Sequence, residues 1–194
     1  DEGRDDVYVR VEAEGFRERD LDDALRAHGR VTILGRRVRP DKLEGLSPER
    51  VDALGPVADL VLVEADGARG RSLKAPAAHE PVVPASCSLM IVLAALDVLG
   101  TPVAGESVHR AEIVGRLAGL GPEDAVTEEA LAACLTHPDG YPARARPGLK
   151  TVVFLNKVED DAGWAAARRI AAHLCAPYDA VVAGSARVDA QRLR

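Results

Sequence analysis

The sequence predicts an α/β fold with a mostly parallel sheet between two layers of helices. Three short runs, Leu60–Val63, Leu89–Leu93 and Val152–Leu155, are apolar at every position. Strands that are covered on both faces of a parallel sheet have this pattern. Stretches with helical periodicity separate the runs, and such alternation is typical of α/β domains. Because 194 residues is the length of one domain, we expect a single α/β domain over residues 1–194.

Six segments are predicted as strands, on the basis of apolar runs of strand length. Charged residues alternate with apolar ones in the first of them, which favours an edge position. In chain order, the predicted strands are Val7–Val11, Val31–Leu34, Leu60–Glu64, Leu89–Ala94, Thr151–Leu155 and Ala180–Ala183.

Four helices are predicted from capping residues and periodicity. Asp20–Leu25 carries acidic residues in its first turn, where the helix dipole favours them. Ser47 before Pro48 is typical of a helix start, and Thr127 begins another helix in the same way. The segment Ala162–Cys175 places its apolar residues on one face. Long loops are expected over Pro76–Pro84 and His137–Gly148, and loops of this length are often functional.

Composition excludes several classes of protein. The formal charge is −6, and no basic cluster is present, which argues against a general nucleic-acid binder. The longest apolar run, Leu89–Leu96, is far shorter than the roughly 20 residues that cross a bilayer, so no membrane partner is expected. The three cysteines form no CxxC pair, and we expect reduced thiols in a cytoplasmic protein. The oligomeric state cannot be predicted from these features.

Two acidic residues end the predicted strand Leu60–Glu64. Glu64 and Asp66 are two residues apart, so in an extended chain they project to the same side. Ligands of open α/β sheets bind beyond the carboxyl ends of the strands, and Mg²⁺ prefers carboxylate oxygens and water. This segment resembles the acidic strand end of P-loop NTPases, which makes Asp66, with Glu64, a candidate magnesium and catalytic site. A solvated Asp-Gly turn is the alternative.

A second candidate site follows the predicted strand Thr151–Leu155. Asn156-Lys157-Val158-Glu159 resembles the base-recognition loop of GTP-binding proteins. A carboxylate there accepts two N–H groups from guanine, whereas adenine would leave it unpaired. Either Glu159 or Asp160 supplies that carboxylate, and an ordinary polar turn is the alternative. Ser185-Ala186, after the last strand, is similar to the segment whose N–H groups contact guanine in the same proteins.

A third group of candidates lies in the loop after Asp66. Its cations have the chemistry to bind phosphate or another oxyanion. Lys74 is also a candidate catalytic residue, which would stabilise the negative charge of a phosphate group. The candidates for anion or partner binding are Gly67, Arg69, Gly70, Arg71, Lys74, His79 and Glu80.

The pattern Glu64-Ala65-Asp66-Gly67, Leu73-Lys74-Ala75-Pro76, His79-Glu80-Pro81 and Pro84 resembles the YqeC family of selenium-dependent hydroxylase accessory proteins. Matching pieces also occur at Lys42–Leu46, Val108–Arg110 and Leu155–Val158, so the resemblance spans about Val31 to Ala183. It implies a P-loop NTPase-like fold and a role in the maturation of molybdenum-containing hydroxylases. The biochemical activity of the family is poorly defined.

The chain departs from this family pattern at one point. The phosphate-loop motif G-x-x-x-x-G-K-[ST], which would follow the first strand, is absent from the 194 residues. Either the first strand and the phosphate loop precede Asp1, or this is a member that does not hydrolyse nucleotide. Because the chain does not begin with Met, we expect the first, so the chain would be the C-terminal major part of such a domain.

Three functions remain open. The first is a nucleotide-binding maturation factor that uses Mg²⁺ with GTP or ATP, acts on a client molybdenum hydroxylase or cofactor carrier, and is an Mg²⁺-dependent NTPase if the phosphate loop is intact. The second is a non-catalytic module that binds a molybdopterin-type cofactor or a partner protein through the Lys74–Pro84 loop. The third is a nucleotidyltransferase-like role in cofactor maturation.

Overall fold

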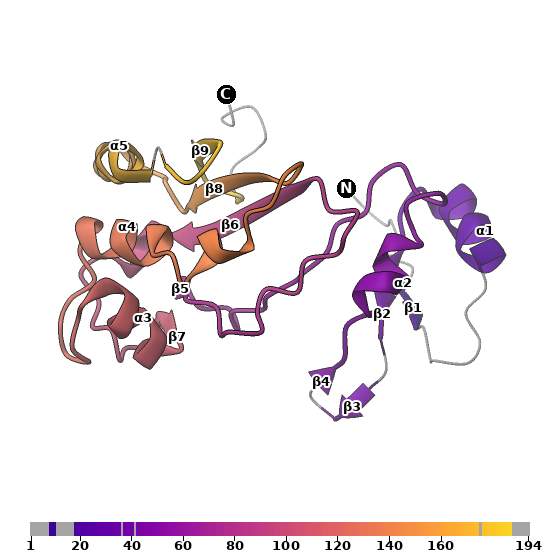
Figure 1. Ribbon diagram of the computed structural model, residues 1–194, viewed down its shortest axis with the longest axis horizontal. Helices are drawn as coiled ribbons and strands as arrows, with labels where there is room; N and C mark the ends of the chain where they lie inside the picture. The colour runs from indigo at the N-terminus through magenta and orange to yellow at the C-terminus, as the bar shows by residue number, and fades with distance from the viewer. Residues whose placement is uncertain (1–7, 11–17, 36, 41, 175, 188–194) are drawn as a thin grey trace. The chain divides into compact units, whose positions relative to one another are not determined.

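The computed structural model describes residues 8–10, 18–35, 37–40, 42–174 and 176–187 (Figure 1). The chain divides into two compact units. One is Asp1–Val63 with Pro84–Ser86, and the other is Glu64–Val83 with Cys87–Arg194. The single domain expected over residues 1–194 stays a prediction.

The first unit contains two short sheets. β1 (Tyr8–Arg10) pairs in parallel with β2 (Thr32–Leu34), which confirms the first two predicted strands. β3 (Arg37–Arg39) pairs antiparallel with β4 (Lys42–Leu43), a hairpin that the apolar pattern did not indicate because its residues are mostly charged.

The described residues of the first unit also form two α-helices. α1 (Glu18–His28) includes the predicted stretch Asp20–Leu25. α2 (Pro48–Asp52) begins where the sequence predicts, since the Ser47 hydroxyl accepts a hydrogen bond from the backbone N–H of Arg50.

The predicted strand Leu60–Glu64 is wrong, because none of its residues belongs to a strand. The side chains of Leu60 and Leu62 are 72% and 83% exposed. A strand needs a neighbour whose N–H and C=O groups pair with its own, and among the described residues no strand pairs with this segment. Apolar composition alone therefore did not decide the conformation here.

The second unit is built on a parallel three-stranded sheet. β6 (Leu89–Ala95) pairs with β8 (Lys150–Asn156), which pairs with β9 (Ala180–Ala183). A second parallel pair joins β5 (Leu73–Lys74) to β7 (Val108–His109). The predicted α/β class with mostly parallel sheets is confirmed.

The described part of the second unit also contains the helices α3, α4 and α5 (Figure 1). α4 (Glu128–Thr136) begins at the predicted N-cap, where the Thr127 hydroxyl accepts from the N–H of Ala130 at 3.1 Å. α5 (Asp161–Leu174) confirms the fourth predicted helix. α3 (Ala111–Ala118) was not predicted, because it is short and contains Gly115, a weak helix former. The second expected loop contains a single 3-10 turn, Tyr141–Arg144.

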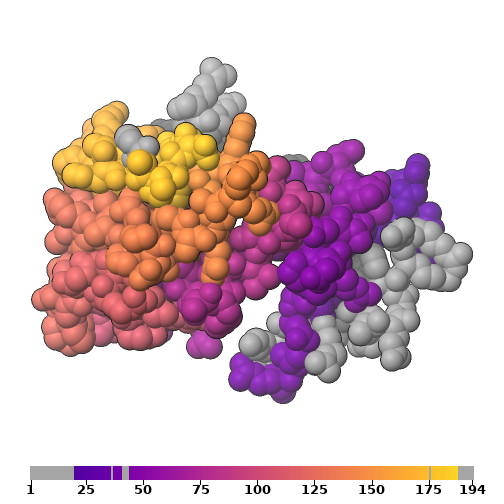
Figure 2. Space-filling view, viewed as in Figure 1, coloured from indigo at the N-terminus to yellow at the C-terminus, as the bar shows by residue number. Residues whose placement is uncertain are grey.

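The core of the second unit lies on one face of the sheet. On β6, Met90, Val92 and Ala94 are buried in that core, whereas Leu89, Ile91 and Leu93 are exposed on the other face. Cover on both faces was therefore a wrong expectation for β6 among the described residues. In the space-filling view, the part of this unit coloured from pink to orange is continuous and closely packed (Figure 2).

Candidate functional site

Polar side chains gather where the strands of the three-stranded sheet end. Asp97 follows β6, Asn156 is the last residue of β8, and Ser185 follows β9. These strands are parallel, so their carboxyl ends share one edge of the sheet, where α/β folds usually bind ligands. β5 is joined to this edge through a 2.8 Å hydrogen bond from the N–H of Ala95 to the carbonyl of Ser72.

The Asn156 side chain joins two loops that are 30 residues apart. Its Oδ1 accepts from the N–H of Lys157 at 2.8 Å and from the N–H of Ala186 at 3.1 Å. Backbone bonds between the ends of β8 and β9, Gly184 to Leu155 and Val158 to Gly184, support the same geometry. The structure thus brings together the two segments that the sequence predicts as base-binding.

Lys157 has a left-handed backbone, with φ of +59°, and its ammonium group bridges two other segments. Nζ donates to Asp97 Oδ2 at 2.6 Å and to Ser72 Oγ at 3.1 Å. Burial alone would raise the pKa of Asp97, but the hydrogen bonds from Lys157 and Ser72 outweigh it and lower that pKa. Lys157 therefore ties the Asn156 loop to the segment that leads into β5.

The structure distinguishes the two acidic residues that follow Lys157. Glu159 is exposed and its Oε1 accepts from the Ser185 hydroxyl at 2.8 Å. Asp160 instead accepts from the N–H of Gly163 at 2.7 Å and so caps the start of α5. Of the two carboxylates, only Glu159 faces the loop after β9.

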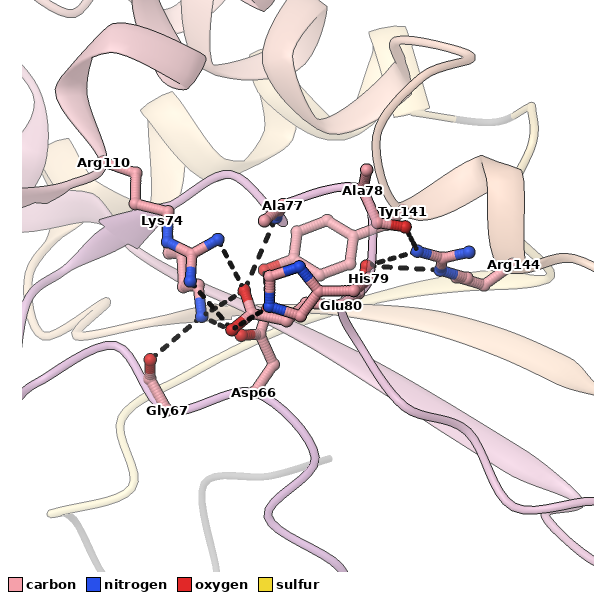
Figure 3. A network of polar contacts seen from close by, with 10 residues as sticks. All are labelled: Asp66, Gly67, Lys74, Ala77, Ala78, His79, Glu80, Arg110, Tyr141 and Arg144. Carbon is pink, nitrogen blue, oxygen red and sulfur yellow. Dashed lines mark hydrogen bonds and ion pairs between the residues drawn. The ribbon is translucent and has the colours of Figure 1, made fainter. Parts of the chain in front are cut away.

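Lys74, on β5, is the centre of a buried charged cluster (Figure 3). Its Nζ donates to Asp66 Oδ1, to the Gly67 carbonyl at 3.0 Å, and lies 3.1 Å from Glu80 Oε2. The Lys74 and Asp66 side chains are only 4% and 9% exposed. The ammonium group is thus already surrounded by oxygen acceptors.

Arg110 completes the pairing of Glu80. Its two terminal nitrogens each lie 2.8 Å from a Glu80 carboxylate oxygen, the bidentate geometry that suits a guanidinium group. Burial raises the pKa of Glu80, but hydrogen bonds from Lys74 and Ala77 and the nearby cations outweigh it, so the pKa lies below its ordinary value.

Asp66 and Glu64 differ in exposure and in their contacts. Asp66 accepts from the Tyr141 hydroxyl at 3.3 Å as well as from Lys74, whereas Glu64 is exposed. Burial raises the pKa of Tyr141, so the phenol stays a donor. In the part of the chain that the structure describes, no three His, Cys, Asp or Glu side chains are placed to hold a metal ion. The predicted magnesium site, one or two carboxylates with water, stays a prediction.

Arg144 holds the loop that carries His79 and Glu80. Its Nη2 donates to the carbonyl of Ala78 at 2.6 Å and to that of Glu80 at 2.8 Å. The His79 side chain is exposed, with Nε2 3.8 Å from Glu80 Oε1. The loop thus has a fixed backbone and an exposed imidazole.

The turn before β5 contains Arg69 and Gly70, both in the left-handed region with φ of +54° and +74°. It is closed by a 3.1 Å hydrogen bond from the N–H of Arg71 to the carbonyl of Ala68. Arg71 also donates from its side chain to the Val108 carbonyl, on β7. Both arginines are exposed, as an anion-binding role requires.

Sequence reasoning missed several residues of these clusters. Asp97 had the clearest signal, a carboxylate three residues after the end of the predicted strand Leu89–Ala94. Arg110 lies in a segment that matches the family pattern, and Tyr141 lies in a loop predicted as functional. The residues that the sequence did not indicate as site residues are Ser72, Asp97, His109, Arg110, Tyr141 and Arg144.

The fold and the site define an α/β protein whose polar residues gather where its parallel strands end. The chain belongs to the YqeC family, because the family model described as YqeC protein matches residues 3–112, more than half of its length. The predicted resemblance to this family is confirmed.

One relative is the protein named "Uncharacterized protein YqeC" from Escherichia coli (strain K12). It is 38% identical over 118 residues, which are 60% of this chain and 46% of the relative. The aligned part therefore spans less than half of the relative's length. No solved structure matches the chain. Among the residues described, no helix has the length and apolar character needed to span a bilayer.

Proposed function

We propose that this protein binds a purine nucleotide at the carboxyl edge of β6, β8 and β9. One observation carries the proposal: Asn156 Oδ1 accepts from the N–H groups of both Lys157 and Ala186, which joins the two predicted base-binding segments. An amide side chain in this position orders both loops before any ligand arrives, which lowers the entropic cost of binding.

Glu159 gives the proposed site its preference for guanine. Its exposed carboxylate accepts one hydrogen bond among the described residues, from the Ser185 hydroxyl at 2.8 Å, so lone pairs remain for the N–H groups of a guanine edge. Adenine offers no such pair of donors and would leave the carboxylate unpaired. Asp160 is excluded from this role because it caps α5.

The finer fold assignment, a three-layer P-loop NTPase-like domain, is part of the proposal. Its support is the parallel order β6-β8-β9, together with the apolar face formed by Leu89, Ile91, Leu93 and Val182, which is exposed among the described residues. A further layer of helices over that face would remove these side chains from water.

We further propose that nucleotide binding serves the maturation of a molybdenum- or selenium-dependent hydroxylase, with the client enzyme or a cofactor carrier as partner. The support is the membership of the YqeC family together with the resemblance described above. Mg²⁺ and hydrolysis of GTP or ATP are proposed only for a protein with an intact phosphate loop.

A second candidate is a non-catalytic module that uses the loop after Lys74 to bind a molybdopterin-type cofactor or a partner protein. The observation that favours it is the pair of hydrogen bonds from Arg144 to the carbonyls of Ala78 and Glu80, which hold the loop while His79 and Val82 stay exposed. Lys74 is a poor anion ligand on this hypothesis, because its ammonium group is already paired with Asp66 and Glu80.

Isothermal titration of the intact protein with GTP, ATP and guanosine tests the first proposal. We expect GTP and guanosine to bind, and Glu159→Gln to weaken both by about tenfold or more, since hydrogen bonds to charged groups contribute about 1.5–3 kcal/mol. Glu123→Gln removes an exposed carboxylate elsewhere in the second unit and is the matched control.

Absence of heat with all three ligands would rule out the nucleotide proposal. Equal loss of affinity in Glu159→Gln and Glu123→Gln would rule out the assignment of Glu159. Binding of a molybdopterin-type ligand without nucleotide affinity would favour the second candidate.

A further inference from the structure

His109 lies among four cationic side chains. On the parallel pair β5–β7 it is the register partner of Lys74, and Arg110 follows it in the chain. Arg71 reaches β7 through its hydrogen bond to the Val108 carbonyl, and Arg69 lies two residues before Arg71. Burial lowers the pKa of His109, and the charges of Lys74, Arg110, Arg69 and Arg71 lower it further, so the local field is positive.

The carboxylates of this region do not compensate all of these charges. Asp66 and Glu80 pair with Lys74, and Glu80 also pairs with Arg110. No ion pair of Arg69 or Arg71 with a carboxylate is found in the described ranges. Among the residues that the structure describes, these two exposed guanidinium groups thus have no counter-charge, although the formal charge of the chain is −6.

The backbone at this place is also unusual. Arg69 and Gly70 are both left-handed, a conformation that a non-glycine residue such as Arg69 adopts only when its surroundings impose it. The turn is closed by the Arg71 to Ala68 hydrogen bond. Arg69 and Arg71 are therefore held on a fixed turn rather than on a free loop.

We propose that Arg69, Arg71 and His109 form an oxyanion-binding site that accepts a phosphate or pyrophosphate group. The guanidinium groups provide paired N–H donors that match the geometry of phosphate oxygens. His109 adds a donor and a positive charge when it is protonated, so an anion favours its charged form. Lys74 and Arg110 are already paired with Asp66 and Glu80. The exposed Arg69 and Arg71 are therefore the cations that can bind the ligand.

This site goes beyond the proposed base recognition and does not depend on it. A nucleotide would bring phosphate together with a base, whereas a free phosphate or a phosphorylated cofactor would bring phosphate alone. Pyrophosphate therefore probes the oxyanion site, guanosine probes the base site, and GTP probes both.

The test is isothermal titration of the intact protein with pyrophosphate at constant ionic strength, at pH 6 and pH 8. We expect the parent protein to bind pyrophosphate more tightly than His109→Gln, and by a larger factor at pH 6, because His109 is then more often protonated. Comparing the two proteins at the same pH cancels the protonation of pyrophosphate itself. Arg69→Ala should weaken binding about tenfold, in line with the loss of a charge-assisted hydrogen bond. Arg69 is exposed and has no ion pair among the described residues, so this variant should fold normally.

Arg168→Ala, an exposed arginine on α5, is the matched control and should leave pyrophosphate affinity unchanged. At pH 8 the affinities of the parent protein and of His109→Gln should differ little. Histidine NMR signals give a second measurement, since pyrophosphate should raise the pKa of His109 in the parent protein but not in Arg69→Ala.

The proposal is overturned if pyrophosphate does not bind, or if Arg69→Ala and Arg168→Ala bind it equally well. It is also overturned if the pKa of His109 does not respond to pyrophosphate. If guanosine binds and pyrophosphate does not, the oxyanion site is ruled out and the base site is retained. If pyrophosphate binds and guanosine does not, the base site alone is ruled out.

Discussion

Two lysines of this arginine-rich chain each bind an aspartate, in different surroundings. Lys74 pairs with Asp66 in the interior of the second unit, where the two side chains are 4% and 9% exposed. Lys157 pairs with Asp97 at 2.6 Å where the sheet ends, and there the side chains are 31% and 48% exposed. The chain has only four lysines, and these two lie in the two segments that carry the predicted site.

The difference in burial separates a structural contact from an exchangeable one. A buried pair that loses one partner leaves an uncompensated charge away from water. An exposed pair is screened and contributes little, so a ligand can replace it at low cost. We therefore infer that the Lys74 cluster fixes the geometry of the loop, whereas Lys157 is available to a ligand.

Lys74→Met should have the largest effect on stability. The variant leaves Asp66 and Glu80 without their shared ammonium group, and we expect the free energy of unfolding to fall by about 3–5 kcal/mol. Urea denaturation followed by circular dichroism measures this loss. Lys150→Met changes an exposed lysine at the start of β8 and should shift it by no more than about 0.5 kcal/mol. Similar small losses in both variants would contradict a structural role for Lys74.

Glu80→Gln should have the next largest effect and should also change the pH dependence. The folded pKa of Glu80 lies below its ordinary 4.5, so its charge stabilises the fold above about pH 4.5. This contribution is lost as the pH falls through the folded pKa. We expect a loss of about 1–3 kcal/mol at pH 7, since two cations lose a charged partner.

Urea midpoints between pH 6 and pH 3 measure that dependence. The stability of Glu80→Gln should decrease less over this range than that of the parent protein. Glu128→Gln, which removes an exposed pair with Arg169, is the matched control and should change the slope less. A parallel decrease in the parent and in Glu80→Gln would contradict the pairing of Glu80 in solution.

Local patterns sufficed to predict much of the fold. Ser47 and Thr127 cap helices where predicted, because a cap depends on residues three apart in the chain. Leu60–Glu64 failed for the opposite reason, since a strand depends on a distant neighbour that its own residues do not specify. The charged hairpin β3–β4 and the short helix α3 lack the apolar periodicity on which the predictions relied.

The sequence could predict single residues of the site but not the contacts between them. The sequence indicated Asn156, Lys157 and Glu159 because they follow a strand, and the structure brings them to Ser185 and Ala186. It could not indicate that Tyr141 would reach Asp66, 75 residues away in the chain, or that Arg110 would pair with Glu80. Such contacts are set by how the elements pack, and no local spacing encodes them.

Asn156→Ala should have an intermediate effect on stability and tests the end of the sheet where Lys157 lies. Two backbone N–H groups, those of Lys157 and Ala186, lose their acceptor, and we expect a loss of about 1–2 kcal/mol. Asn156→Asp keeps the accepting oxygen and should recover most of this stability. Hydrogen exchange of the Ala186 amide gives a local readout. Unchanged protection of that amide in Asn156→Ala would show that Asn156 does not join the two loops.

Lys157→Met should have the smallest effect on stability and so tests the comparison most directly. An exposed pair contributes about 0–1 kcal/mol, so the free energy of unfolding should change by no more than that. If Lys157 is available to a nucleotide, the affinity for GTP should nevertheless fall, by about tenfold, because a charged donor is lost from the site. Asp97→Asn removes the negative charge beside Lys157 and should leave GTP affinity equal or higher. A destabilisation of Lys157→Met as large as that of Lys74→Met would mean that both lysines are structural, and the distinction drawn from their burial would then fail.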